Sequence, residues 1–102
     1  VEIGMAPRLD VFLVSLGGQA RKQSLTWLQK IRQAGFSADG DFIGRSVKAQ
    51  FREANRQNAR FVLVLGDDEI ARGEINVKLM DKGEQISVPF ERVIYLLNEN
   101  TD

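Results

Sequence analysis

Residues 41–69 read DFIGRSVKAQFREANRQNARFVLVLGDDE, and this stretch decides the fold of the chain. A segment rich in arginine, with apolar residues at helical spacing, leads into the apolar run FVLVL at residues 61–65, and an acidic turn follows. The first part is typical of an amphipathic helix, and the second of a β-strand covered on both faces. A helix that feeds a buried strand indicates an α/β protein with parallel strands.

The residues before this stretch repeat the same pattern. Residues 11–16 (VFLVSL) form a second apolar run, so they are predicted to be a buried strand. A helix opens after Gly17 and Gly18, and Gly35 lies where its C-terminal cap belongs. Residues 36–39 are predicted to be a short edge strand. The helix is expected to bury one stripe of residues: Ala20, Ser24, Trp27, Leu28, Ile31 and Ala34.

The residues after it change from unbroken apolar runs to alternation. Residues 67–72 fit one or two helical turns that end at Gly73, and residues 74–80 alternate apolar and polar side chains, as a strand with one wet face does. Residues 81–84 are a turn, and the return strand ends at Pro89. A terminal helix carries apolar residues at i, i+3, i+4 and i+7: Phe90, Val93, Ile94 and Leu97. The order predicts a three-layer α/β sandwich, with a mixed five-stranded sheet flanked by helices.

The length and composition of the chain limit the number of domains and the class of protein. A chain of 102 residues makes one domain, predicted to span residues 9–102, and residues 1–8 are predicted to be a linker from an upstream domain. The absence of cysteine suits a reducing cytosol, so a cytoplasmic location is expected. No apolar run approaches the roughly 20 residues that cross a bilayer.

A row of cations on the central helix is the main functional signal. Residues 45–65 carry five cations and one anion, whereas residues 66–102 carry four cations and nine anions, so the neutral total hides a local cationic stripe. Val47, Phe51 and Ala54 lie on a broadly opposing face and are expected to pack. Four of the cations fall within about 80° of one another on a helical wheel: Arg45, Lys48, Arg52 and Arg56. The stripe indicates a nucleic-acid contact, although a solvated helix face has the same pattern.

Three further side chains suit contact with RNA bases. Phe42, at the head of the helix, can stack on an unpaired base or belong to the core. Glu69 can accept hydrogen bonds from a base edge, and Lys78, on the polar side of its strand, can donate to a base or a phosphate.

The chain lacks the side chains that most often carry out catalysis. The chain has no histidine and no cysteine, so the usual general base, imidazole ligand and thiolate nucleophile are missing, and no catalytic residue is assigned. The acidic run at residues 67–69 lacks the spacing of a calcium loop and suits the first turn of a helix, so no metal site is assigned. Gly17 and Gly18 match neither common phosphate-binding glycine spacing and ease a tight turn instead.

Three segments together resemble a known family: VFLVSLG from residue 11, GRSVKAQFREANRQNARFVLVLGDDEIARGEINVKLM from residue 44, and QISVPFERVI from residue 85. They resemble the C-terminal anticodon-binding domain of class II aminoacyl-tRNA synthetases, and the histidyl type fits best. The resemblance runs from about residue 9 to residue 97, in the family's order of elements. It implies the mixed five-stranded sheet and a role in docking the anticodon loop of histidine tRNA.

The resemblance also implies roles for single residues. Glu69 and Lys78 match positions where class II relatives contact anticodon bases, and Arg45 and Lys48 lie in a segment near the loop. Asn58 stands where some threonyl-type relatives have an arginine, so this position departs from the family pattern. Adenylation and aminoacyl transfer belong to a separate catalytic domain, and this chain is expected to need no cofactor of its own. The parent enzyme is expected to use ATP and magnesium, to be a homodimer and to bind tRNA.

Two other functions stay open at this point. Domains of this resemblance also occur in synthetase-like regulators and polymerase accessory subunits, where the surface binds protein or another nucleic acid. A small-molecule-binding α/β module that uses the turn at Gly17 and Gly18 is the other alternative. A large exposed apolar patch or an oligomer of the isolated domain would favour the first, and thermal stabilisation by a nucleotide or a phosphate compound would favour the second.

Overall fold

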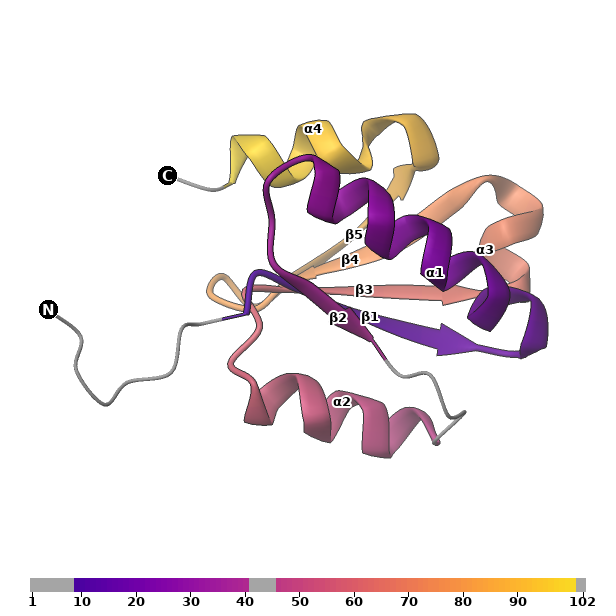
Figure 1. Ribbon diagram of the computed structural model, residues 1–102, viewed down its shortest axis with the longest axis horizontal. Helices are drawn as coiled ribbons and strands as arrows, with labels where there is room; N and C mark the ends of the chain where they lie inside the picture. Colours follow the sequence, from indigo (N-terminus) through magenta and orange to yellow (C-terminus); the bar gives the residue numbers. More distant parts are fainter. Residues whose placement is uncertain (1–8, 41–45, 101–102) are drawn as a thin grey trace, which may run out of the picture.

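The computed structural model describes residues 9–40 and 46–100, which form a five-stranded sheet with helices on both faces (Figure 1). Helices α1 and α4 cover one face of the sheet and α2 covers the other, as the sequence predicts for a three-layer α/β sandwich. The elements are, in order, β1 (Val11–Leu16), α1 (Gly18–Gln33), β2 (Ala38–Gly40), α2 (Val47–Arg56), β3 (Phe61–Gly66), α3 (Asp67–Arg72), β4 (Glu74–Leu79), β5 (Glu84–Pro89), a 3-10 turn (Phe90–Arg92) and α4 (Val93–Glu99).

The sheet is mixed, with the strand order β2-β1-β3-β4-β5. Strands β2, β1 and β3 are parallel, whereas β4 and β5 form an antiparallel hairpin on β3. Strands β1 and β3 therefore end at the same side of the sheet, where α1 and α3 begin. We call this side the carboxyl edge, defined by Leu16–Gly18 and Gly66–Glu69. In open α/β sheets such an edge is the usual place for a ligand, because the connections from adjacent strands diverge there.

The two faces of the sheet bury separate cores, because successive side chains of a strand point to opposite sides. In β1, Val11 and Leu13 belong to the core under α1 and α4, whereas Phe12 and Val14 belong to the core under α2. Trp27 of α1 is 5% exposed and meets the ring of Phe90 edge to face, with 5.3 Å between ring centroids. None of the helices in the described residues combines the length and the apolar character that crossing a bilayer requires.

Three expectations need correction. Ala34 was expected in the buried stripe of α1 but is exposed, because it is the C-cap residue and precedes Gly35, whose positive φ of 99° turns the chain away from the helix. The edge strand begins at Ala38 rather than at residue 36, and Phe36 is buried ahead of it. The terminal helix begins as a 3-10 turn, so α4 itself starts at Val93.

Candidate nucleic-acid interface

Helix α2 is fixed to the sheet by a buried glutamine that sequence reasoning missed. Gln50 is 2% exposed, and its side-chain amide accepts a hydrogen bond from the Ser15 N–H at 2.9 Å and donates one to the Ser15 carbonyl at 3.0 Å. The Val11 N–H donates a hydrogen bond to the Ser37 carbonyl, just before β2. Alternate residues of a parallel strand direct their backbone N–H and carbonyl groups to the same neighbouring strand, so the backbone groups of Ser15 also face the β2 side. The described part of β2 ends at Gly40, which pairs with Leu13. Beyond this described part of β2, Gln50 supplies a partner for both backbone groups of Ser15.

The contacts of α2 define which of its sides face the solvent. Ala54 is buried and Phe51 is half-buried against the core under α2, as expected. Val47 was expected to pack with them, but it is 43% exposed. It is the first residue of the helix and precedes the turn that Gln50 fixes to β1. The side chain of Ser46 caps the helix by accepting from the Ala49 N–H at 3.2 Å. These contacts hold the cationic side of α2 outward.

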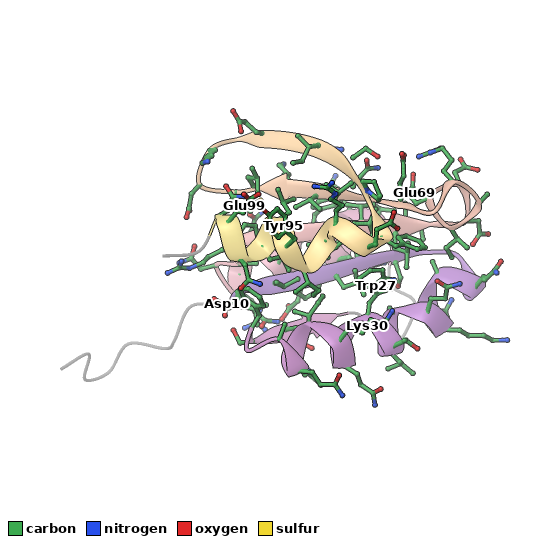
Figure 2. All side chains as sticks on the ribbon, turned by 90° about the horizontal axis from the view of Figure 1, so that it is seen from above. Asp10, Trp27, Lys30, Glu69, Tyr95 and Glu99 are labelled. Atoms are coloured by element: carbon green, nitrogen blue, oxygen red, sulfur yellow. The ribbon has the colours of Figure 1, made fainter. Side chains whose placement is uncertain are left out.

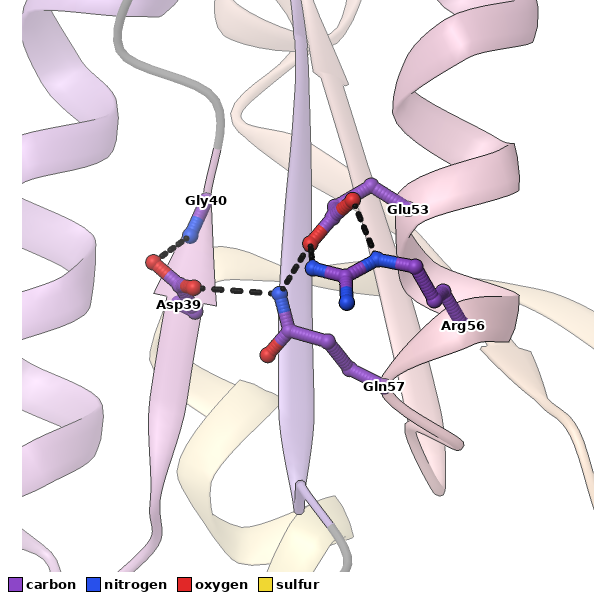
Figure 3. A network of polar contacts seen from close by, with 5 residues as sticks. All are labelled: Asp39, Gly40, Glu53, Arg56 and Gln57. Carbon is purple, nitrogen blue, oxygen red and sulfur yellow. Dashed lines mark hydrogen bonds and ion pairs between the residues drawn. The ribbon is translucent and has the colours of Figure 1, made fainter.

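The structure divides the predicted cations of α2 into two kinds. Lys48 and Arg52 are exposed, and neither has an ion-pair partner among the described residues. Arg56 forms a hydrogen-bonded ion pair with Glu53, which raises the pKa of Arg56 (Figure 3). Its positive charge is therefore already matched by a carboxylate. Arg45 and Phe42 lie outside the described residues.

The same carboxylate helps to tie α2 to the edge of the sheet. Gln57, just past the end of α2, donates to Glu53 at 2.8 Å and to Asp39 of β2 at 3.2 Å (Figure 3). Asp39 also accepts from the Gly40 N–H at 2.8 Å. This network lies on the β2 side of α2, so Glu53 and Arg56 form part of the support of the helix on the sheet.

The opposite side of α2 faces the β4–β5 hairpin. Lys78 of β4 pairs with Val62 of β3, which belongs to the core under α2, so Lys78 projects from the same face of the sheet as α2. Its Nζ lies 5.9 Å from the centroid of the Phe51 ring, within the range of a cation–π contact. Lys48 lies one helical turn before Phe51, where the packed face of the helix borders its cationic face. Lys48 and Lys78 therefore flank the junction between α2 and β4.

Polar side chains continue this surface along the hairpin. The pairing of β4 with β5 sets Asn76 opposite Ser87 and Lys78 opposite Gln85, so these four side chains share the face of the sheet that carries Lys78. Gln85 and Ser87 are exposed, and Asn76 and Lys78 are half-buried. We call these four residues the polar face of the hairpin. It offers amide, hydroxyl and ammonium groups, which can form hydrogen bonds with RNA bases and phosphates.

Glu69 lies in the first turn of α3, at the carboxyl edge and away from Asp10 and Glu99 at the other end of the molecule (Figure 2). Its carboxylate accepts from Arg72 at 3.1 Å, and its side chain is 13% exposed. Arg72 also lies 3.5 Å from Glu74, the first residue of β4. Four residues, or about 13 Å of strand, separate Glu74 from Lys78. Glu69 and Lys78 can thus contact one RNA strand, but through different nucleotides.

Asn58 does not join this surface. It adopts the left-handed conformation with φ 55° in the turn that follows α2, and its N–H bonds to the Asn55 carbonyl at 3.0 Å. The whole of β3, about 17 Å long, separates this turn from α3. Asparagine tolerates this conformation better than most residues, so the backbone turn accounts for its presence there.

The arrangement suits the binding of a polyanion better than a reaction. Lys48, Arg52 and Lys78 supply positive charge on one side of the molecule, and the polar face of the hairpin and Glu69 supply groups that can form hydrogen bonds with bases. Residues 9–40 and 46–100 contain no group of three histidine, cysteine, aspartate or glutamate side chains that could hold a metal ion. The acidic run at residues 67–69 lies in the first turn of α3, where carboxylates offset the helix dipole.

Comparison with known proteins identifies the class. Residues 10–100 match the family described as the anticodon binding domain, and the chain belongs to that family. Its curated relatives are named histidine–tRNA ligases. The relative from Symbiobacterium thermophilum is 51% identical over 88 residues, which cover 86% of this chain and 20% of the relative. The relative from Geobacillus sp. (strain WCH70) is 40% identical over 99 residues, covering 97% of this chain and 23% of the relative.

A solved structure agrees with these relatives. Crystalline apo histidyl-tRNA synthetase from S. aureus superposes with a TM-score of 0.85 and 32% sequence identity, covering 95% of this chain and 25% of that chain. The predicted fold class is therefore confirmed. The chain spans between a fifth and a quarter of the length of the relatives that it matches.

Proposed function

We propose that this chain is the tRNA-recognition domain of a histidyl-tRNA synthetase and docks the anticodon loop of histidine tRNA. The observation that carries the proposal is the 51% identity over 88 residues with a histidine–tRNA ligase. The surface made by α2 and the hairpin supports it, because Lys48 and Arg52, which have no ion-pair partner within residues 9–40 and 46–100, lie on the side of the molecule that also carries groups able to bond bases. The regulator or accessory function has no comparable observation in its favour.

In this proposal some side chains bind the phosphates of the loop and others distinguish its bases. Lys48 and Arg52 hold phosphates of the loop, with Arg45 as a further candidate, and Arg56 contributes less because Glu53 already balances its charge. Glu69 accepts a hydrogen bond from a base N–H, and Lys78 donates to a base or a phosphate of another nucleotide. RNA sequence is recognised on unstacked loop bases rather than in the deep groove of the A-form helix. Neither step needs a cofactor bound to this domain.

The rest of the proposed enzyme lies beyond this domain. Residues 1–8 are the proposed linker to a catalytic domain, which carries out ATP- and magnesium-dependent aminoacylation as part of a cytoplasmic homodimer. Relatives about four to five times longer than this chain support such a division, because residues 10–100 account for the anticodon-binding family alone.

Titration with RNA tests the proposal. The chain is titrated with a labelled anticodon stem-loop of histidine tRNA and with the same stem carrying a scrambled loop, at two salt concentrations. We expect tighter binding of the histidine loop at both, with both affinities falling as salt rises because phosphate contacts release counterions. Equal affinity for the two loops at both salt concentrations would contradict anticodon recognition and leave only a cationic RNA-binding surface.

A further inference from the structure

The side chain of Glu69 is folded back over Gly66, the last residue of β3. A Cβ atom built on Gly66 would lie 2.6 Å from Oε1 of Glu69, closer than real Cβ atoms come to any neighbour. Gly66 has an extended backbone with φ −124°, so the conformation of the chain does not itself require glycine. The absence of a side chain at Gly66 leaves the space that the flexible carboxylate of Glu69 occupies, so a methyl group at this position would displace the carboxylate.

The other oxygen of this carboxylate is engaged. Arg72 Nη2 lies 3.1 Å from Oε2 of Glu69, one helical turn away on α3. Among the described residues, the structure shows no donor to Oε1 of Glu69. One oxygen is therefore held by arginine, whereas the oxygen over Gly66 keeps its capacity to accept a hydrogen bond.

Arg72 also reaches the hairpin. Its Nε lies 3.5 Å from Oε1 of Glu74 at the start of β4, and the same oxygen accepts from the Ser87 hydroxyl of β5 at 3.0 Å. The chain of contacts runs from α3 through the start of β4 to β5. It links the position of Glu69 to the polar face of the hairpin, which contains Ser87.

We propose that Arg72 is a positioning residue for anticodon recognition. It holds Glu69 over Gly66 with one carboxylate oxygen free, and through Glu74 and Ser87 it sets that oxygen relative to the hairpin. The proposal rests on the proposed function, because Glu69 must accept from a base. The expected partner is an N–H group of a loop base, which guanine, adenine, cytosine and uracil all present on their Watson–Crick edges.

The charge of Arg72 has a second effect on the same contact. An isolated carboxylate repels the phosphates of an RNA loop, whereas a carboxylate paired with a guanidinium presents less net charge to the approaching strand. The side chain of Arg72 is 53% exposed, and exposed ion pairs contribute little to the stability of a fold. Removal of Arg72 should thus change recognition far more than stability.

The experiment compares six variants of the full chain: Glu69→Gln, Arg72→Gln, the double variant, Arg72→Lys, Gly66→Ala, and Arg92→Gln as the control. Arg92 is an exposed arginine with no recorded contact to this network. The measured quantity is the ratio of affinities for the histidine anticodon stem-loop and for loops in which each base in turn is replaced. The thermal midpoint of each variant is measured in parallel.

We expect Glu69→Gln and Arg72→Gln each to reduce discrimination at the same loop position by about fivefold or more. The double variant should discriminate no worse than Glu69→Gln alone, because residues that act through one another are not additive. Arg72→Lys should restore part of the discrimination, Gly66→Ala should lower it by displacing the carboxylate, and Arg92→Gln should leave it unchanged.

Three results would overturn the proposal, and they differ in what else they reject. Normal discrimination by Arg72→Gln, together with a loss for Glu69→Gln, would reject the positioning role and leave the proposed function intact. Additive losses in the double variant would make Arg72 a direct RNA contact. No loss for Glu69→Gln would reject base recognition by Glu69 and the role of Arg72 with it.

Discussion

Replacement of Gln50 by leucine tests how α2, the helix proposed to hold RNA, is fixed to the sheet. The amide of Gln50 satisfies both the N–H and the carbonyl of Ser15, at 2.9 and 3.0 Å, and is almost completely buried. Leucine has a similar size but no polar group, so both backbone groups lose this partner. Each buried polar group left unsatisfied costs about 1–3 kcal/mol, and the apolar side chain offsets part of that cost. We expect the free energy of unfolding to fall by about 2–4 kcal/mol.

Such a loss is large for a domain of this size. Small domains are stable by roughly 5–15 kcal/mol, and the expected change lowers the thermal midpoint by about 10–25 °C. Urea unfolding can be followed through the fluorescence of Trp27, the only tryptophan of the chain, which is buried in the native state. Gln29→Leu, at an exposed position of α1, is the matched control and should change stability by less than about 0.5 kcal/mol. A Gln50→Leu variant as stable as this control would refute the structural role of the amide.

The remaining predictions concern charge and backbone conformation. Lys48→Ala should weaken binding to every loop and reduce the slope of log affinity against log salt by about 0.7, the value for one phosphate of a single strand. Lys22→Ala, in α1 on the other face of the sheet, makes the same change of charge and should leave the slope unaltered. If Lys48→Ala also leaves the slope unaltered, Lys48 does not contact a phosphate. Arg52→Ala should weaken RNA binding more than Arg56→Ala, because a carboxylate already balances Arg56; equal losses would mean that this ion pair opens on RNA. Gly73→Ala should lower the free energy of unfolding by about 1–2 kcal/mol in the urea assay, because φ is 69° at this helix cap, and a loss indistinguishable from zero would contradict that reason.

Patterns that depend on hydrophobicity alone were readable from the sequence. The run at residues 61–65 is buried, with Val64 alone half-buried, and β4 alternates buried and half-buried side chains along its whole length, as predicted. The expected order of strands and helices is confirmed for the same reason, since each element carries its own periodicity. Local signals of this kind need no knowledge of which strands pair.

Gln50 escaped prediction because a polar side chain resembles a solvated one until its partner is known. A signal was present: residues 47, 50, 51 and 54 have the i, i+3, i+4, i+7 spacing of a packing face, and glutamine occupies one of these positions. The role of the amide becomes visible only with the register of β1, in which Ser15 lies two residues beyond Leu13, the partner of the last described residue of β2, Gly40. That condition depends on strand register, which the sequence pattern does not specify.

The candidate site was partly readable for similar reasons. Exposure of Lys48 and Arg52 follows from the helical wheel, and the pairing of Arg56 with Glu53 follows from their spacing on one helix. The distance between Glu69 and Lys78 could not be obtained in this way, because it depends on how β3 pairs with β4. The link from Arg72 through Glu74 to β5 likewise exists only in the folded sheet.

The distribution of charge around the carboxyl edge sets how an RNA loop can approach. Asp67 and Asp68 are exposed in the first turn of α3, and Arg72 engages Glu69 rather than these two carboxylates. They repel phosphates over a distance of about 8 Å at physiological salt, whereas the cations of α2 attract them. We therefore expect a bound loop to lay its backbone along α2 and to turn its bases toward α3. In the proposed binding mode, the acidic residues favour this orientation of the strand, in which Glu69 would meet a base edge and not a phosphate.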